Sequence, residues 1–281
     1  MTATSATTAG RATAPLATDR VTLAYDRLVV AEDLTVAVPA GSFTVIIGPN
    51  GCGKSTLLRA LARTLKPRSG RVLLDGAPMD AMRTKAIARR LALLPQSPIA
   101  PEAITVGDLV ARGRYPHQGL LRQWSPEDAR AVDAAMAATE VTDLRDRYVS
   151  DLSGGQRQRA WLAMALAQET DLLLLDEPTT FLDIAHQFEV MDLCARLHEE
   201  GRTLVAVLHD LNQAARYGSH VIAMKAGRVV AEGPPQDVVT EALVRDVFGL
   251  AARVLPDPET GTPMVVPARR DAHVRHGGDG A

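Results

Sequence analysis

One stretch limits the fold of this 281-residue chain more than any other. It consists of Gly48, Pro49, Asn50, Gly51, Cys52, Gly53, Lys54, Ser55 and Thr56. It follows an apolar run at residues 43–47, precedes an apolar helical stripe at residues 57–65, and fits the pattern G-x-x-x-x-G-K-[ST] without a mismatch. A strand therefore turns into a helix at glycines that let backbone N–H groups approach phosphate oxygens. The pattern predicts a nucleotide site in which Lys54 neutralises the β- and γ-phosphates and Ser55 binds Mg²⁺.

Composition excludes several classes of protein. The chain is 46% hydrophobic, enough to fill one substantial core or two modest lobes. Its 31 Lys and Arg residues face 33 Asp and Glu residues, and the net charge of −2 gives no global attraction to nucleic acid or anionic lipid. Two cysteines make neither a disulfide framework nor a metal cluster, which suits a reducing cytosol. No apolar run reaches the ~20 residues that cross a bilayer, so a membrane role requires another chain to supply the spanning helices.

The two ends of the chain have unusual compositions. Residues 1–19 are mostly Ala and Thr without an apolar core, which predicts a disordered leader rather than a secretory signal, with an organelle transit peptide as the alternative. Ordered structure is expected to begin at Arg20. Residues 268–281 are predicted to be a disordered tail, and the histidines in this tail leave metal binding as the alternative.

Strand patterns flank the glycine-rich stretch. Residues 21–25 and 34–38 are predicted to form an antiparallel layer at the edge of the core. Tyr25 closes the first of these strands, where its ring either stacks on a nucleotide base or is an ordinary strand tyrosine. Further along, residues 221–231 predict a hairpin, residues 236–248 a helix and residues 265–266 a last strand.

The middle of the chain is rich in predicted helices. Residues 90–96 form a short strand stopped by proline, which leaves Gln96 at the mouth of a loop. Glutamine is both a donor and an acceptor, so Gln96 could contact Mg²⁺ or the attacking water; a polar loop residue is the alternative. A helical subdomain is predicted at about residues 97–168, inserted into the core. Within it, residues 111–118 combine arginines, an aromatic ring and helix breakers, which indicates either a docking surface or a solvated turn.

Two later stretches add a second anion site and two carboxylates. The first consists of Ser153, Gly154, Gly155 and Gln156. Ser153 is a helix N-cap, the glycines let backbone amides converge, and the helix that follows directs its positive end outward. The run at residues 172–177 predicts a buried parallel strand that ends in Asp176, a Mg²⁺ ligand, and Glu177, turned the other way by strand alternation as the general base.

These features together resemble the ATPase of ABC transporters. The phosphate loop, Gln96, residues 152–156, residues 172–177, Asp183 and His209 follow one another in the order typical of that family, and the resemblance covers residues 20–267. Three further stretches are similar to the ATP-binding subunits of bacterial ferric-siderophore importers, notably the ferric enterobactin type: residues 111–118, 178–187 and 207–214.

The resemblance implies an α/β fold, a P-loop NTPase core of the RecA type with an antiparallel edge layer and an inserted helical subdomain. It also implies a head-to-tail homodimer that encloses two ATP molecules with Mg²⁺, in which Ser153 and Gly155 of one subunit face the γ-phosphate held by Lys54 of the other. Asp183 would bridge the two sites, and His209 would contact the γ-phosphate and orient the attacking water.

The implied partners are separate transmembrane permease chains and, indirectly, a substrate-binding protein; no nucleic acid is expected. The chain would lie on the cytoplasmic face of the membrane as a peripheral subunit. A permease helix is expected in a pocket between Gln96 and His117, near Arg112 and Arg114. Import of cobalamin, haem or another metal chelate is the alternative cargo, and a transporter-independent ABC ATPase is the alternative class. That class would need a coiled-coil insertion or two fused cassettes.

Overall fold

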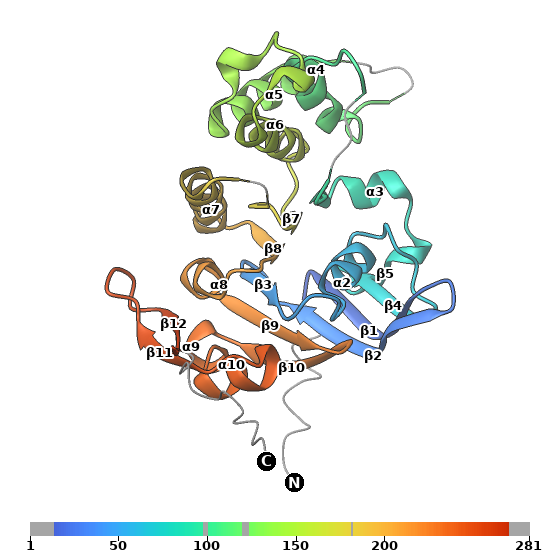
Figure 1. Cartoon of the computed structure of the whole chain (residues 1–281). Helices are drawn as coiled ribbons and strands as arrows, with labels where there is room; N and C mark the ends of the chain where they lie inside the picture. Colours follow the sequence, from blue (N-terminus) through green and yellow to red (C-terminus); the bar gives the residue numbers. More distant parts are fainter. Residues whose placement is uncertain (1–13, 98–100, 120–123, 181, 270–281) are drawn as a thin grey trace, which may run out of the picture.

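The computed structural model of the chain describes residues 14–97, 101–119, 124–180 and 182–269. A six-stranded sheet with strand order β10-β9-β3-β8-β7-β6 forms its centre (Figure 1). The strands are β3 (Phe43–Ile47), β6 (Leu91–Leu94), β7 (Leu172–Asp176), β8 (Thr203–Val207), β9 (His220–Lys225) and β10 (Arg228–Gly233). Neighbouring strands are parallel except β9 and β10, which form the predicted hairpin. The carboxyl ends of β3, β7 and β8 therefore meet at one edge, where open α/β sheets bind ligands.

Helices and a second sheet bury both faces of the central sheet. The helices that pack against its strands are α2 (Lys54–Leu61), α6 (Gly154–Ala167), α7 (Ile184–Glu199) and α8 (Leu211–Tyr217). Because successive strand side chains point to opposite sides, Val45 and Leu173 enter the core shared with α6, α7 and α8. Ile46 and Leu174 enter the other core, shared with α2 and the second sheet. Burial on both faces explains why these strands are continuous apolar runs in the sequence.

The second sheet is antiparallel, as predicted, with strand order β2-β1-β4-β5. Its strands are β1 (Leu16–Tyr25), β2 (Leu28–Val38), β4 (Ser69–Leu74) and β5 (Ala77–Pro78). The prediction that ordered structure begins at Arg20 is wrong, because Leu16 is buried and pairs with Val38 on one side and Leu74 on the other. Leu16, Ala17 and Thr18 are buried in succession and Arg20 has a left-handed φ of 46°, so the first half of β1 lacks the alternation of a half-buried strand. The rest of the predicted leader, residues 1–13, lies outside the described residues.

A group of helices lies at one end of the sheet (Figure 1). The interval predicted as a helical subdomain contains α4 (Val106–Ala111), α5 (Pro126–Ala138), α6 and the short 3-10 helices η2 (Arg112–Arg114), η3 (Thr142–Leu144) and η4 (Val149–Asp151). Their buried faces meet through Leu109, Met136 and Leu162, among others. The boundaries of the subdomain stay a prediction. Along the chain, η1 (Met79–Ala81) and α3 (Thr84–Ala88) lie between β5 and β6.

The C-terminal part contains more elements than predicted. The helix expected at residues 236–248 is two helices, α9 (Pro235–Val238) and α10 (Glu241–Phe248). They are separate because the Thr240 hydroxyl accepts a bond from the Leu243 N–H and so caps a new helix. Gly249, with a φ of 66°, ends α10, and the chain then forms β11 (Ala252–Pro256), which was not predicted, and β12 (Pro263–Pro267). The predicted tail from residue 270 onward lies outside the described residues.

Among the helices in the described part of the chain, none combines the length and the apolar character of a membrane-crossing helix.

Candidate functional site

The phosphate loop lies between the end of β3 and the start of α2, as predicted. Its backbone takes positive φ at Gly48 (150°) and Gly53 (102°). A Cβ at Gly48 would lie 2.2 Å from the carbonyl oxygen of Met224, and one at Gly53 would lie 3.1 Å from Cγ1 of Val30. These glycines therefore allow both the turn and the close approach of neighbouring strands.

Lys54 begins α2 and is only 5% exposed. Its Nζ donates to the carbonyl oxygens of Gly48 (2.9 Å) and Pro49 (3.0 Å). A buried ammonium has to be paired or hydrogen-bonded, and these two carbonyls hold it at the loop. The cation and the N-terminus of α2 together make the loop attractive to a phosphate group.

Asp176, at the end of β7, is the best candidate for a metal ligand. Its side chain is almost fully buried, and its Oδ1 atom has no hydrogen-bond partner. Burial raises the pKa of this carboxyl, while the Ser55 hydroxyl and the Arg59 guanidinium, with Nε 3.8 Å from Oδ2, act in the opposite direction. An orphaned carboxylate oxygen beside a hydroxyl fits the oxygen ligands that Mg²⁺ prefers.

The structure brings three of the predicted catalytic residues together. Glu177 Oε2 accepts from Gln96 Nε2 (2.5 Å), and Glu177 Oε1 lies 2.7 Å from His209 Nε2. The Thr180 hydroxyl also donates to Oε2 (3.1 Å), a contact that the sequence analysis missed. Strand alternation does not orient Glu177, because β7 ends at Asp176 and Glu177 takes a left-handed φ of 55°. Thr180 stabilises this turn, because its N–H also donates to the Glu177 carbonyl oxygen (3.2 Å).

The predicted second anion site is the start of α6. The Ser153 hydroxyl accepts from the Gln156 N–H, and the Gln156 side chain accepts from the Ser153 N–H (3.2 Å), which completes a capping box. Gly155 has a further role that the sequence did not indicate, since a Cβ there would lie 2.9 Å from Cδ2 of His186 at the start of α7. The N-terminus of α6 belongs to the helical group, away from α2 in the same chain (Figure 1).

Asp183 and Tyr25 occupy the ends of two further elements. Asp183 is the N-cap of α7, and its Oδ1 accepts from the His186 N–H (3.0 Å) and lies 2.6 Å from His186 Nδ1. These bonds from His186 lower the pKa of the Asp183 carboxyl. The Tyr25 hydroxyl accepts from Arg59 (3.2 Å). Tyr25 itself is half-exposed at the end of β1. Arg59 could have been found from the sequence, because it lies four residues after Ser55 and therefore on the same side of α2.

Within residues 111–118, Arg112, Tyr115 and Gln118 line a groove, but Arg114 does not lie beside Arg112 at a docking surface as expected. Arg114 is only 4% exposed, and its guanidinium donates to Asp128 (2.9 Å), Glu169 (2.6 Å) and the carbonyl oxygen of Ala167 (2.7 Å). It ties α5 to the end of α6 and cannot serve as a docking residue. His117 is held in the same way, with Nε2 2.8 Å from the carbonyl oxygen of Gln168.

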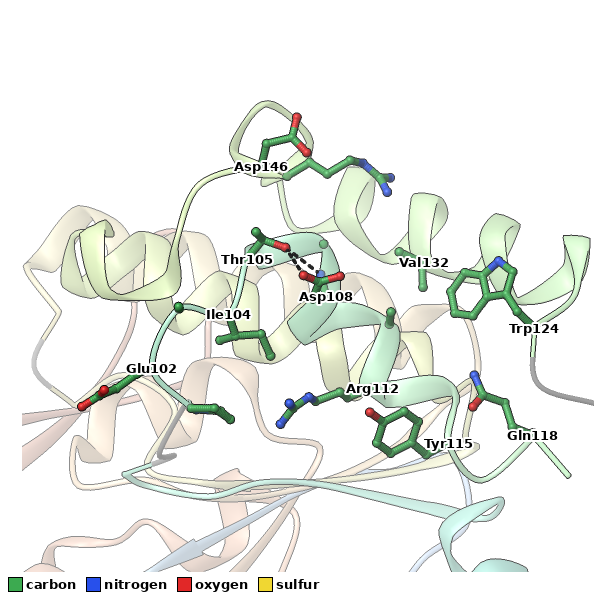
Figure 2. Close-up of a pocket in the computed structure, with 15 residues that line it drawn as sticks. Glu102, Ile104, Thr105, Asp108, Arg112, Tyr115, Gln118, Trp124, Val132 and Asp146 are labelled. Carbon is green, nitrogen blue, oxygen red and sulfur yellow. Dashed lines mark hydrogen bonds between the residues drawn. The ribbon is translucent and has the colours of Figure 1, made fainter. Parts of the chain in front are cut away.

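A groove with a volume of about 800 Å³ runs across the helical group (Figure 2). It is lined by Arg112, Tyr115, Gln118, Trp124 and Asp146, together with residues from 101 to 108. The Tyr115 side chain is 60% exposed. Neither Gln96 nor His117 is among the residues that line this groove. The groove is therefore not bounded by the two residues that were predicted to enclose the pocket.

The fold and the geometry of the site define a class of protein. A phosphate loop after one parallel strand, a carboxylate pair after the next but one, and a histidine after the strand between them are the parts of a P-loop NTPase. Comparison with known proteins gives the family. Residues 31–180 match the ABC transporter family.

Curated relatives agree over nearly the whole chain. The ferric enterobactin transport ATP-binding protein FepC of Escherichia coli (strain K12) is 55% identical over 255 residues, which cover 90% of this chain and 94% of that protein. The probable siderophore transport system ATP-binding protein YusV of Bacillus subtilis (strain 168) is 54% identical, with 91% and 93% covered. Among solved structures, a putative metal-chelate type ABC transporter in an inward-facing conformation aligns with a TM-score of 0.78 at 26% identity, covering 91% of this chain and 98% of that one. The chain belongs to the ABC transporter family.

Proposed function

We propose that this chain binds and hydrolyses ATP as the nucleotide-binding subunit of an importer for ferric siderophores. The observation that carries the hydrolytic role is the convergence of Gln96, Thr180 and His209 on Glu177, next to the buried carboxylate of Asp176. A carboxylate with three polar neighbours beside a phosphate loop can accept a proton from water as the water attacks the γ-phosphate.

Each residue then has a distinct role in the reaction. The loop from Gly48 to Thr56 cradles the phosphates, and Lys54 neutralises the charge on their β and γ groups. Ser55 and Asp176 would hold Mg²⁺, with Gln96 as a further contact; the ion would offset negative charge on the phosphates.

Glu177 takes a proton from the attacking water as the water oxygen bonds to the γ-phosphorus. The bond from the γ-phosphorus to the bridging oxygen breaks, and ADP and inorganic phosphate are released. His209, held against Glu177, orients the water and contacts the γ-phosphate. Tyr25 offers its half-exposed ring to the adenine.

The second anion site supports a head-to-tail homodimer. Ser153 and Gly155 begin α6 in the helical group, away from the loop that contains Lys54 (Figure 1), so one chain alone does not bring both sites to one phosphate. In the dimer Ser153, Gly154, Gly155 and Gln156 of one subunit would face the γ-phosphate held by the other, with Asp183 between the two sites. A solved ABC transporter cassette titled as a dimeric structure aligns with a TM-score of 0.70 at 27% identity, covering 78% of this chain and 98% of that one.

The nature of the cargo follows from the relatives. The names of FepC and YusV refer to ferric enterobactin and siderophore transport. A hemin import ATP-binding protein of Nocardia farcinica is also 44% identical over 85% of this chain, which keeps haem as the second candidate. Radiolabelled uptake in a strain lacking this chain would decide between them. Loss of iron-siderophore uptake with normal haem uptake supports the first cargo, and the reverse result supports the second.

The permease would dock in the groove around Arg112 and Tyr115, whose exposed side chains surround a cavity large enough for a short helix. The chain would accordingly lie on the cytoplasmic face of the membrane as a peripheral subunit, and Gln96 would pass movement of the helical group to Glu177.

Reversing the charge with Arg112→Glu should lower transport while basal ATPase activity is kept. Arg228→Glu, at an exposed arginine of β10, serves as the control. Equal loss of both activities in Arg112→Glu would contradict docking at this groove.

The hydrolytic role is tested by Glu177→Gln. This variant should bind ATP, lose turnover and accumulate as an ATP-bound dimer in gel filtration, because the amide cannot accept the proton of water. Glu200→Gln, at an exposed glutamate after α7, is the control and should hydrolyse ATP like the unaltered chain. Normal turnover in Glu177→Gln would refute the role of Glu177.

A further inference from the structure

Two glutamines link α7, the helix that follows Asp183, to α8, the helix that follows His209 and Asp210. Gln213 on α8 is 6% exposed, and its Nε2 donates to Oε1 of Gln187 on α7 (3.0 Å). The Nε2 of Gln187 in turn donates to the carbonyl oxygen of Leu182 (3.1 Å). A continuous chain of hydrogen bonds therefore runs from the first turn of α8, through α7, to the residue before Asp183.

The two ends of this chain of bonds reach Asp183 and Asp210, the residue next to His209. Asp210, which follows His209, is the N-cap of α8 and accepts from the Gln213 N–H (3.1 Å). Asp183 is the N-cap of α7, and its carbonyl oxygen accepts from the Gln187 N–H (3.0 Å). Both glutamines thus lie in the first turn of helices whose caps adjoin the site.

A third contact fixes α8 from its other side. Asn212 makes two bonds to Val265 of β12: its Oδ1 accepts from the Val265 N–H (2.7 Å), and its Nδ2 donates to the Val265 carbonyl oxygen (3.3 Å). Figure 1 shows β12 beside α8, with α7 on the opposite side of that helix. The start of α8 is therefore held between the C-terminal hairpin and Gln187.

The pairing of the glutamines is incomplete. Gln213 Oε1 is buried and has no hydrogen-bond partner. Leaving such an acceptor unsatisfied destabilises the fold, so a glutamine here is a poor choice if packing is its only purpose. An apolar side chain of the same length would fill this space without that cost.

We propose that Gln187 and Gln213 are positioning residues that set the distance between the His209 loop and the Asp183 loop and so keep His209 against Glu177. This inference rests on the proposed hydrolytic function. Among the hydrogen bonds of the described residues, none joins either glutamine to the phosphate loop, so their loss should slow the chemical step without weakening ATP binding. A hydrogen bond of ordinary strength predicts a fall in kcat of about three- to tenfold with KM for ATP unchanged.

Methionine is the test substitution, because it keeps the length of the side chain and removes the amide. Steady-state ATPase activity is measured with saturating Mg²⁺ and ATP for Gln187→Met, Gln213→Met and the double variant. Since one link joins the two residues, the double variant should lose no more kcat than the worse single variant. Gln236→Met, at an exposed glutamine of α9, should leave kcat unchanged.

Thermal unfolding of the same proteins separates positioning from stability. A lowered melting temperature with normal kcat and KM, or losses in kcat that multiply in the double variant, would overturn the proposal. If Gln213→Met does not fold, Gln187→Met and Gln187→Glu carry the test, because Gln187 is only half-buried and glutamate keeps the acceptor for Gln213 but loses the donor to Leu182. Gln187→Glu should then lose less kcat than Gln187→Met, and equal, normal rates in both would refute the link. An inactive unaltered chain or a fully active Glu177→Gln would instead refute the proposed function, on which this inference rests, and the glutamine variants are not needed to see that failure.

Discussion

Replacing Arg114 with methionine would remove the cation from a buried ion pair. Arg114 Nε donates to Asp128 Oδ1 (2.9 Å), and both side chains are almost fully buried. The other oxygen of Asp128 accepts from the backbone N–H and the hydroxyl of Ser125, each at 2.9 Å, and so caps α5. The Arg114→Met variant therefore leaves a buried carboxylate that keeps its cap but loses its countercharge.

The expected cost follows from this burial. Removing one partner of a buried ion pair destabilises a protein by about 3–5 kcal/mol, because the remaining charge is left without compensation. For a chain of this size each kcal/mol lowers the melting temperature by roughly 2–3 °C. Arg114→Met should therefore melt about 6–15 °C lower. The contact with Glu169 adds little, since that carboxylate is largely exposed.

Thermal unfolding followed by circular dichroism measures this shift, and Arg112→Met provides the matched control. Arg112 lies two residues earlier, is exposed and lines the groove of Figure 2, so its loss should change stability by no more than about 0.5 kcal/mol. A melting temperature for Arg114→Met within about 2 °C of the unaltered chain would show that the ion pair does not hold the helical group together.

The dependence on pH gives the same experiment a second readout. Burial alone would raise the pKa of Asp128, but the hydrogen bonds from Arg114 and Ser125 outweigh it and lower that pKa. A carboxyl whose pKa is lower in the folded chain stabilises the fold above its unfolded pKa of about 3.9, and this contribution is lost as the pH falls through the folded pKa. The difference in stability between the unaltered chain and Arg114→Met should therefore be full at pH 7 and shrink below about pH 4.

Three further predictions concern Lys54 of the phosphate loop, Gly155 at the start of α6 and the two buried thiols. Lys54→Ala should abolish ATPase activity measured with the permease present, and turnover at the normal rate would refute the assigned phosphate contact. Gly155→Ala should lower activity, because its Cβ would lie 2.9 Å from Cδ2 of His186; the double variant with His186→Ala should recover part of the loss if this clash is the cause. Burial raises the pKa of Cys194 to about 12 and also raises that of Cys52, so neither thiol should react with an alkylating reagent at pH 8 until the chain is unfolded. Rapid labelling of Cys52 in the folded chain would show that the phosphate loop is open on the side that packs against Gly48.

The phosphate loop and the strand ends could be predicted because the rules that place them are local. A glycine-rich turn between an apolar strand and an apolar helix stripe defines the position of Lys54 within a single stretch of sequence. Asp176 and His209 could be expected close together because each follows a buried strand, and the carboxyl ends of parallel strands meet at one edge of a sheet. In the structure β3 and β7 both pair with β8, and His209 lies 2.7 Å from Glu177, the residue after Asp176.

The role of Arg114 could not be predicted in the same way. Arg112 and Arg114 look equivalent in the sequence, and the helix before them, α4, has six residues, too few to show which side faces inward. The difference is set by Asp128 and Glu169, which lie 14 and 55 residues away along the chain. Burial of a charged side chain depends on partners at such distances, so composition alone favours a surface position for both arginines.

The link between Gln187 and Gln213 shows the same limit at the nucleotide site. The two residues lie 26 positions apart, in stretches that the sequence marks only as typical of siderophore importers. Each follows an aspartate cap, which places both in the first turn of a helix, yet no periodicity tells which faces of α7 and α8 meet. Packing of both helices on the same face of the sheet brings the first turns together, and only then can one amide reach the other. A sequence pattern therefore identifies the residues proposed to contact the nucleotide, whereas the residues that we propose hold those groups in position follow from how the helices pack.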